Sequence, residues 1–225
     1  MSQASRRPRG VLLDIDGTLL DSNDAHAQAW VAALRDVGLD VPFEQVRPMI
    51  GMGGDKVVPA LTGHREDHPE AKRAVERKRT HFDRLLPTLR PFPGARALLE
   101  RLRAEGCVLV VATSAGGDEA AKLLAQAGVA DLVHEETTKA DVESSKPDPD
   151  IVHAALRKGG LRADEVVMLG DTPYDIAAAR QAGVPTVAMR CGGWWDDRAL
   201  GGAVARYDDP AALLRDFEAS PLAGR

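Results

Sequence analysis

The sequence predicts an α/β protein whose Rossmann-like parallel sheet carries an inserted all-helical domain after its first strand. Three observations support this prediction. The run Val11–Leu13 is apolar without interruption, as in a strand that is buried on both faces of a parallel sheet. After residue 91, strand patterns alternate with helix patterns, whereas residues 21–90 show only helical spacing. We therefore expect a core formed by residues 1–20 and 91–225 and a helical cap formed by residues 21–90.

Length and composition are those of an ordinary globular protein. The chain has 225 residues, of which 44% are hydrophobic and 28% charged, and its net charge of -5 gives no electrostatic footprint for nucleic acid. No run approaches the roughly 18 apolar residues of a membrane span, and two cysteines, Cys107 and Cys191, make no metal or disulfide framework. Residues 1–10 lack the apolar region of a signal peptide, so we expect a disordered leader. These features predict a cytoplasmic monomer or homodimer with no nucleic-acid or membrane partner.

The expected cap begins with helix signals directly after the first strand. Residues 21–24 offer several N-caps, and apolar residues then recur at helical spacing as far as Gly38. A glycine-rich loop follows at residues 50–56. The apolar positions of residues 70–86 predict a long helix, whose many basic residues either steer an anionic ligand inward or form a solvated face.

The expected core resumes at the Pro-rich turn that begins at residue 91. We expect strands at residues 107–113, 131–134, 166–170 and 184–189. We expect helices at residues 95–105, at 118–128, from about 149 to 159, before Gly183, and at about 210–217. Alternation at these lengths favours a parallel sheet with right-handed crossovers.

Polar residues follow three of the expected strands. They are Asp14 and Asp16 after the first strand, Thr113 and Ser114 after the second, and Asp171 after residue 170. In an open parallel sheet, ligands bind beyond the carboxyl ends of the strands, so we expect these side chains to converge. Neighbouring carboxylates repel one another unless a divalent cation or a shared proton offsets their charge, and oxygen ligands suit Mg²⁺.

The loops after these strands carry further polar groups. Gly17 permits a sharp turn and Thr18 offers a hydroxyl and an N–H at the same place. Lys146 precedes a proline, which keeps it out of helical geometry and places it on a stiff loop. Thr172 and Asp175 have the spacing of a capping box.

Taken together, these residues resemble the four motifs of the haloacid-dehalogenase-like superfamily. The match extends from residue 11 to about residue 183, and it consists of Asp14, Asp16, Thr113, Lys146, Asp171 and Asp175, in that order. A helical insertion directly after the first motif is similar to the branch that includes phosphoglycolate phosphatases and β-phosphoglucomutases.

The resemblance implies a role for each residue. Asp14 would be the nucleophile, and Asp16 would protonate the leaving oxygen and then activate water. Mg²⁺ would be held by Asp14, Asp171 and the backbone carbonyl of Asp16. Asp175 would complete this acidic set and orient Lys146 or metal-bound water.

Phosphate binding is expected from the residues around the nucleophile. The set comprises Gly17, Thr18, Thr113, Ser114 and Lys146, with Thr113 favoured over Ser114 as the ligand from the second motif. Hydroxyls, backbone N–H groups and an ammonium would hold the equatorial oxygens, where transition-state charge gathers.

We therefore predict a Mg²⁺-dependent phosphatase that hydrolyses a small phosphorylated metabolite through an aspartyl-phosphate. A sugar-phosphate mutase similar to β-phosphoglucomutase is the alternative, and a non-catalytic phosphate-binding module is a third possibility. Dehalogenase and phosphonatase relatives lack a carboxylate at the position of Asp16, which disfavours those activities.

Two cap residues, His26 and Lys56, are candidates for contact with the leaving group of the substrate. His64 and His68 are four residues apart, but their surroundings do not make the metalloprotease pattern, so we expect no zinc site there.

Overall fold

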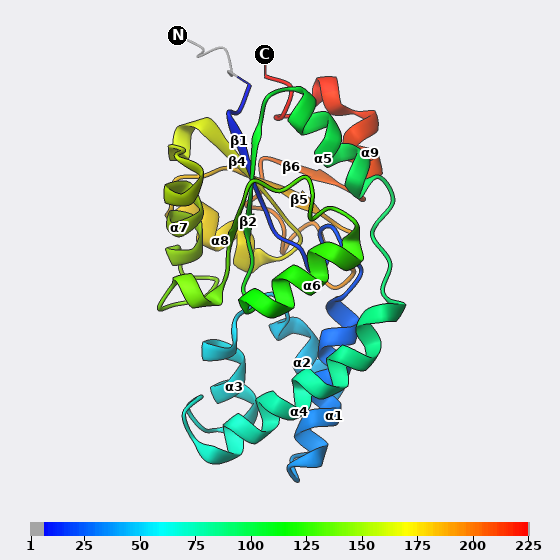
Figure 1. The fold of residues 1–225 in the computed structure, drawn as a ribbon, viewed down its shortest axis with the longest axis vertical. Coiled ribbons are helices and arrows are strands. Elements are labelled where there is room, and N and C mark those ends of the chain that lie inside the picture. Colours follow the sequence, from blue (N-terminus) through cyan, green and yellow to red (C-terminus); the bar gives the residue numbers. More distant parts are fainter. Residues whose placement is uncertain (1–6, 225) are drawn as a thin grey trace.

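A six-stranded parallel sheet forms the centre of the computed structural model, which describes residues 7–224 (Figure 1). Its strands are β1 (Gly10–Leu13), β2 (Val108–Ala112), β3 (Glu135–Thr137), β4 (Val166–Gly170), β5 (Thr186–Met189) and β6 (Ala205–Tyr207). The spatial order is β3-β2-β1-β4-β5-β6, and every neighbouring pair is parallel. The chain moves outward from β1 to β3 and then crosses to β4, so the strand order reverses between β1 and β4. This reversal is where open α/β sheets bind ligands. The predicted α/β class is confirmed.

Helices cover both faces of the sheet because β1 is apolar on both of its sides. Val11 and Leu13 pack with one set of helices, while Leu12 packs with the other set. The first set is α5 (Ala95–Ala104), α6 (Gly117–Ala127) and α9 (Pro210–Arg215); the second is α7 (Asp150–Gly159) and α8 (Pro173–Gln181). Successive side chains of a strand point to opposite faces of the sheet, and both faces are covered by apolar layers. This explains why β1 has no polar residue.

The segment between β1 and α5 is helical in the structure and lies at one end of the molecule, below the sheet in Figure 1. Its helices are α1 (Asn23–Asp36), α2 (Phe43–Val46), α3 (Gly54–Thr62) and α4 (Pro69–Leu85). We call α1–α4 the helical module. It has its own apolar cluster, which includes Trp30, Leu34 and Val57.

The segments that lead into and out of the helical module are hydrogen-bonded to each other. The N–H of Asp21 donates to the carbonyl of Arg90 (3.0 Å), and the N–H of Phe92 donates to the carbonyl of Leu19 (3.0 Å). The entering and returning segments therefore lie side by side.

Two elements differ from the sequence prediction. A strand is expected at residues 131–134, but these residues form the turn after α6, and β3 begins at Glu135. β6 was not predicted, because its residues are only partly buried at the edge of the sheet and form no apolar run.

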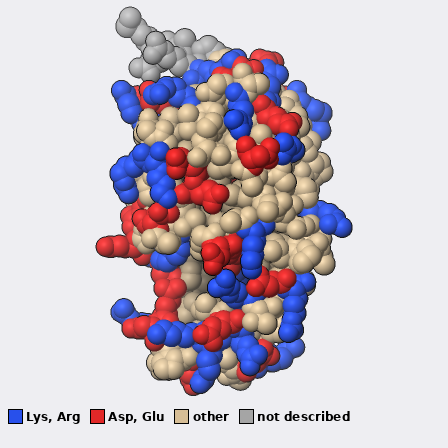
Figure 2. Space-filling model, viewed as in Figure 1, with Lys and Arg blue, Asp and Glu red and all other residues tan. Residues whose placement is uncertain are grey.

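Residues 1–6 of the expected leader lie outside the described residues, whereas Gly10 already belongs to β1. None of the helices within residues 7–224 has the length and apolar character needed to cross a bilayer. Acidic and basic side chains are interspersed on the face shown in Figure 2, so this face has no broad surface of one charge.

Candidate active site

Three carboxylates meet where β1 and β4 end. Asp14 directly follows β1 and Asp171 directly follows β4, while Asp175 lies in the first turn of α8. The N–H of Asp14 donates to the carbonyl of Leu169 (3.0 Å), which continues the pairing of the two strands and brings these ends together. The three side chains are buried, and one oxygen from each lies within 4.8 Å of the others.

The predicted capping box fixes Asp175 within this group. The hydroxyl of Thr172 accepts a hydrogen bond from the N–H of Asp175 (3.2 Å), and the Asp175 carboxylate accepts one from the N–H of Thr172 (3.0 Å). The capping box is therefore confirmed. It holds the carboxylate at the start of α8 while leaving its other oxygen to face Lys146.

Lys146 supplies one positive charge to the carboxylates. It is fully buried, and its Nζ lies 2.6 Å from Oδ1 of Asp14 and 2.7 Å from Oδ1 of Asp175. Burial opposes the charge of the ammonium, but the two carboxylates outweigh it and raise the pKa of Lys146. Three carboxylates and one ammonium leave two negative charges when all four groups are ionised.

The remaining negative charge suits a hard divalent cation. Burial and the neighbouring carboxylates raise the pKa of Asp14 to about 7, with Lys146 opposing the shift, and they raise the pKa of Asp171 well above its ordinary value. Thus the metal-free site favours protons on these groups. A donor set of carboxylate oxygens is the one that Mg²⁺ prefers, so the residues present fit such an ion.

The turn after Asp14 packs directly against this site. Gly17 has a φ of +76°, and a Cβ at this position would overlap the amide of Asn23 and the carboxylate of Asp171. The hydroxyl of Thr18 lies 3.4 Å from Asp14 and 3.4 Å from Asp171. Glycine is therefore required at residue 17 both for its backbone conformation and for space.

Asp16 lies outside the close carboxylate group and has different partners. His26 Nε2 lies 2.9 Å from its Oδ1, and the Ser22 hydroxyl donates to the same oxygen. Burial opposes ionisation of Asp16, but His26 and Ser22 outweigh it and lower its pKa. Asp14 and Asp16 therefore lie in different environments, and without an ion their pKa values are displaced in opposite directions.

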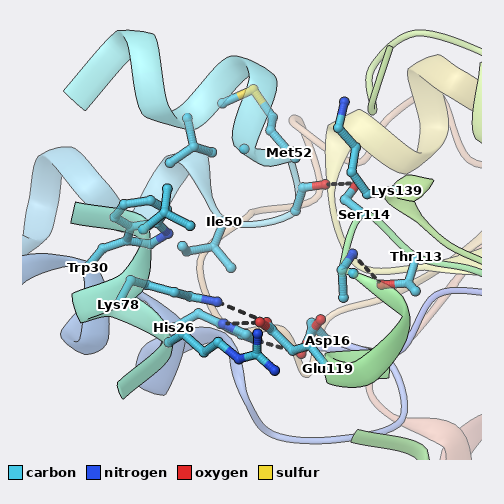
Figure 3. A pocket seen from close by; sticks show the side chains of 18 of the residues that line it. Asp16, His26, Trp30, Ile50, Met52, Lys78, Thr113, Ser114, Glu119 and Lys139 are labelled. Carbon is cyan, nitrogen blue, oxygen red and sulfur yellow. Dashed lines mark hydrogen bonds and ion pairs between the residues drawn. The ribbon is translucent and has the colours of Figure 1, made fainter. Parts of the chain in front are cut away.

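His26 belongs to a chain of polar contacts between the helical module and the core. Its Nδ1 lies 3.7 Å from Oε1 of Glu119 on α6, and the same oxygen lies 2.9 Å from Nζ of Lys78 on α4 (Figure 3). The His26 ring also stacks on Phe82, with centroids 3.9 Å apart. His26 is therefore held on both its edge and its face.

A cavity of about 550 Å³ opens between the helical module and the core beside these groups (Figure 3). Asp14, Asp16, Thr113 and Ser114 line it. Thr113 is buried at the end of β2, whereas Ser114 donates from its hydroxyl to the carbonyl of Gly51 (3.2 Å). Of the two candidates from the second motif, Ser114 is thus engaged by the glycine-rich loop of the helical module.

Lys56 does not line this cavity. Its Nζ lies 2.7 Å from Oδ2 of Asp148, on the loop before α7. The suggested contact between Lys56 and a leaving group therefore has no support from its position, because its charge is directed to another contact between the helical module and the core.

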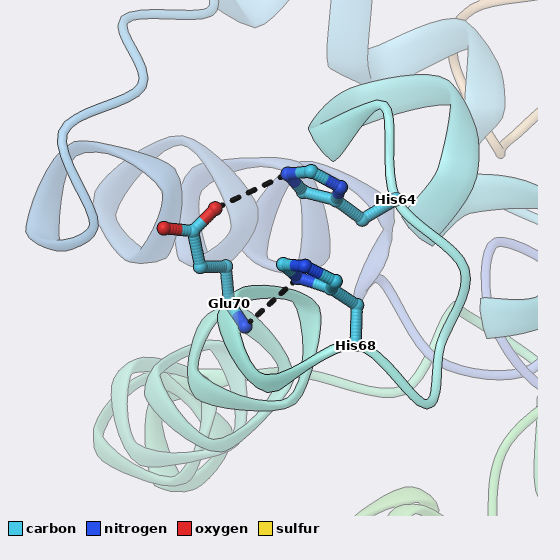
Figure 4. Close-up of side chains that lie close together, drawn as sticks. All are labelled: His64, His68 and Glu70. Atoms are coloured by element: carbon cyan, nitrogen blue, oxygen red, sulfur yellow. Dashed lines mark hydrogen bonds and ion pairs between the residues drawn. The ribbon is translucent and has the colours of Figure 1, made fainter.

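His64 and His68 stack with ring centroids 3.9 Å apart, and Glu70 lies beside them (Figure 4). His64 Nε2 lies 3.1 Å from Oε2 of Glu70, and the N–H of Glu70 donates to Nδ1 of His68 (3.3 Å). These donor atoms could gather around an ion. An ion pair and the N-terminal cap of α4 account for the same arrangement.

Sequence reasoning missed several residues beside the site. Asn23 donates from Nδ2 to Oδ2 of Asp171 (2.8 Å), although the sequence suggested only an N-cap there. Arg47 is buried, with its Nε 2.6 Å from Oδ1 of Asp24, and it donates to the carbonyl of Gly192. Such contacts join segments far apart in the sequence, so no local pattern marks them.

Comparison with known proteins places the chain among phosphatases. A family model described as Haloacid dehalogenase-like hydrolase matches residues 11–189. A phosphoglycolate phosphatase from Rhodospirillum rubrum is 33% identical over 216 residues, which cover 92% of this chain and 89% of that protein. Another from Xanthomonas campestris pv. campestris is 33% identical over 217 residues, covering 94% of this chain and 91% of that protein.

Solved structures show the same fold. A hydrolase from Pseudomonas syringae has a TM-score of 0.86 at 31% identity, covering 93% of this chain and 98% of that chain. A putative beta-phosphoglucomutase from Bacteroides vulgatus has a TM-score of 0.85 at 25% identity, covering 96% of this chain and 89% of that chain.

Proposed function

The chain belongs to the haloacid dehalogenase-like hydrolase family, and from this premise we propose that it hydrolyses a small phosphorylated metabolite in a magnesium-dependent reaction. It is a phosphoric monoester hydrolase. The observation that carries the magnesium proposal is the group of Asp14, Asp171 and Asp175, whose oxygens lie within 4.8 Å of one another with a single ammonium among them.

Asp14 is the proposed nucleophile. Its carboxylate would attack phosphorus and form an aspartyl-phosphate, which divides one difficult displacement into two steps. Lys146, whose Nζ lies 2.6 Å from Oδ1 of Asp14, would bind an equatorial phosphate oxygen, and Thr113, Gly17 and Thr18 would supply the further phosphate contacts. Thus the phosphoryl group would be held as its charge redistributes.

Asp16 is the proposed general acid and base. It would donate a proton to the departing alcohol oxygen and later take one from the attacking water. Asp14, Asp171 and the backbone carbonyl of Asp16 would hold Mg²⁺, whose charge offsets that of the nucleophile and the phosphate. Asp175 would position Lys146, from which it lies 2.7 Å.

We also propose that residues 21–90 act as a cap over a core formed by residues 1–20 and 91–225. The cavity is lined from both parts, so movement of the cap would admit the ester and exclude bulk water during the reaction.

Replacement of the nucleophile tests the proposed chemistry. Asp14→Asn should reduce phosphate release by at least about 10³-fold, because an amide cannot form the covalent intermediate. Phosphate release with Mg²⁺ would be followed on a panel of phosphomonoesters, with circular dichroism to check folding. Asp67→Asn, at an exposed loop position, is the matched control. Substantial activity in folded Asp14→Asn would contradict the assignment.

Sugar-phosphate mutation is the alternative reaction of the same residues. The phosphoglycolate phosphatases from Rhodospirillum and Xanthomonas are 33% identical to this chain, whereas the putative beta-phosphoglucomutase from Bacteroides vulgatus is 25% identical, which favours hydrolysis. Incubation with β-glucose 1-phosphate, with glucose 6-phosphate and free phosphate both measured, separates the two reactions. Formation of glucose 6-phosphate in preference to free phosphate would favour the mutase.

A further inference from the structure

The part of the cavity away from the carboxylates has an apolar wall. It consists of Trp30 on α1, Ile50 and Met52 in the glycine-rich loop, Val57 on α3 and Val75 on α4, of which Figure 3 labels Trp30, Ile50 and Met52. Val75 is 39% exposed although it lies on α4, a helix that is otherwise rich in charged residues. An apolar surface that faces a cavity favours an occupant with apolar surface of its own.

The cations that line the cavity already have carboxylate partners. Lys78 Nζ lies 2.9 Å from Glu119, and Arg79 Nη2 lies 3.4 Å from Asp118. The third, Lys139, has its Nζ 2.9 Å from Asp55. Within residues 7–224, therefore, every lysine or arginine that lines the cavity lies within 3.4 Å of a protein carboxylate.

Apart from Asp14, which Lys146 offsets, the lining carries one more carboxylate than it has lysines and arginines. Its carboxylates are Asp14, Asp16, Glu66, Asp118 and Glu119, and its lysines and arginines are Lys78, Arg79 and Lys139. A carboxylate on the leaving group would have to displace a protein carboxylate from its cation or stay unpaired beside like charges. Both outcomes raise the free energy of binding.

We infer that the alcohol part of the substrate is uncharged and partly apolar, and that it does not carry a carboxylate as glycolate does. The inference rests on the proposed phosphatase activity and specifies its substrate class. The cavity of about 550 Å³ falls in the roughly 300–1,000 Å³ range of small-molecule pockets, so it has room for an alcohol part larger than glycolate.

The test compares esters that differ in charge but not in shape. Isobutyl phosphate has the branched outline of 2-phosphoglycolate with methyl groups in place of the carboxylate oxygens, and benzyl phosphate adds apolar surface. We expect kcat/KM for both neutral esters to exceed that for 2-phosphoglycolate by at least about tenfold. A preference for 2-phosphoglycolate would overturn the inference but leave the phosphatase intact. No Mg²⁺-dependent turnover of any ester would remove the proposed function and the inference with it.

A single substitution tests whether an added positive charge in the apolar wall of the cavity changes substrate selectivity. Val75→Lys places an additional cation at a half-exposed position of the cavity, so kcat/KM for 2-phosphoglycolate should rise about tenfold relative to that for isobutyl phosphate. Val75→Thr is the matched control, because it adds polarity without charge and should leave the ratio near that of the wild type. If Val75→Lys leaves the ratio unchanged, pairing of the native cations does not determine selectivity and the inference is wrong.

Discussion

His26 is held in one orientation by groups on two sides. Its Nε2 faces Asp16, its Nδ1 faces Glu119, and its ring lies on Phe82. Because a general acid must present its proton in a fixed direction, an imidazole locked against Asp16 positions the carboxylate that we propose transfers the proton.

Replacement of His26 tests this positioning role. His26→Gln retains a donor but loses the ring that stacks on Phe82, so we expect kcat to fall by about 10–100-fold with a smaller change in KM. The limb of the pH–rate profile that reports Asp16 should also shift to higher pH, because loss of the imidazole removes a group that lowers the pKa of Asp16. Steady-state kinetics across pH provides the measurement. An unchanged profile with reduced kcat would indicate that His26 acts only in packing.

At the scale of single residues, the sequence is informative where chemistry depends on a strand end. Asp14, Asp171 and Lys146 stand in recognisable local contexts, and the structure brings them together. Asn23 and Glu119 could not be identified in this way. Each has the local appearance of a helix-start residue, and its partner, Asp171 or His26, comes from a distant segment.

At the scale of elements, β1 is held by apolar packing on both faces. Leu12, at its centre, is fully buried among side chains of α7 and α8. Leu12→Ala should therefore lower the free energy of unfolding by about 2–5 kcal/mol, since it removes apolar contacts and leaves a cavity. Urea denaturation measures this loss. Val204→Ala, at a position 57% exposed, is the control and should change stability little.

The ion pair between Lys78 on α4 and Glu119 on α6 should make the free energy of unfolding depend on pH. Burial raises the pKa of Glu119, but Lys78 and His26 outweigh burial and lower it below its ordinary value of 4.5. A lowered pKa means that the folded state binds fewer protons than the unfolded state. The stabilisation is therefore present above pH 4.5 and is lost as the pH falls further.

Glu119→Gln should remove this pH-dependent stabilisation, because glutamine does not ionise. The wild type should exceed the variant in unfolding free energy by about 1 kcal/mol or less near neutral pH, and the difference should shrink below pH 4.5. Asp83→Asn breaks the more exposed pair with Lys122 on the same two helices and should have the smaller effect. A difference that is constant with pH would show that Glu119 stabilises by packing alone.

Element boundaries were predictable where burial is complete. β4 has the predicted bounds because all of its residues are buried and apolar or glycine. β6 escaped prediction because an edge strand with Arg206 at its centre needs apolar contacts on only part of its surface. Partial burial removes the periodic signal on which sequence reasoning depends.

At the scale of the whole molecule, ion binding should be linked to folding. A cation that binds the folded chain alone stabilises it by about 2.7 kcal/mol at one hundred times its dissociation constant. We therefore expect Mg²⁺ to raise the melting temperature, and removal by EDTA to lower it and to abolish hydrolysis. Differential scanning fluorimetry over a Mg²⁺ titration measures the shift.

Asp171→Asn is the matched variant for this experiment. It should lose the Mg²⁺-dependent shift, yet be at least as stable as the wild type without the ion, because it relieves repulsion by Asp14 and Asp175. Asp67→Asn should keep the shift. A full Mg²⁺ response in Asp171→Asn would place the ion elsewhere.

The overall architecture was predictable because two levels of pattern agree. An apolar first strand, a helical stretch and a regular strand–helix alternation permit few topologies once connections must be right-handed. The substrate was not predictable, because the cavity wall is assembled from loops and helix faces whose relative placement no local pattern specifies.

The adjacent entry and exit at Asp21 and Phe92 make the excursion between them separable from the sheet. A short turn could bridge the two segments, and strand register would not change. A different inserted segment could also begin and end at these two positions, while the carboxylates after β1 and β4 keep their places. If the proposed cap selects the ester, reaction chemistry and substrate choice would be encoded in separate stretches of the chain, and selectivity could change while the catalytic residues stay the same.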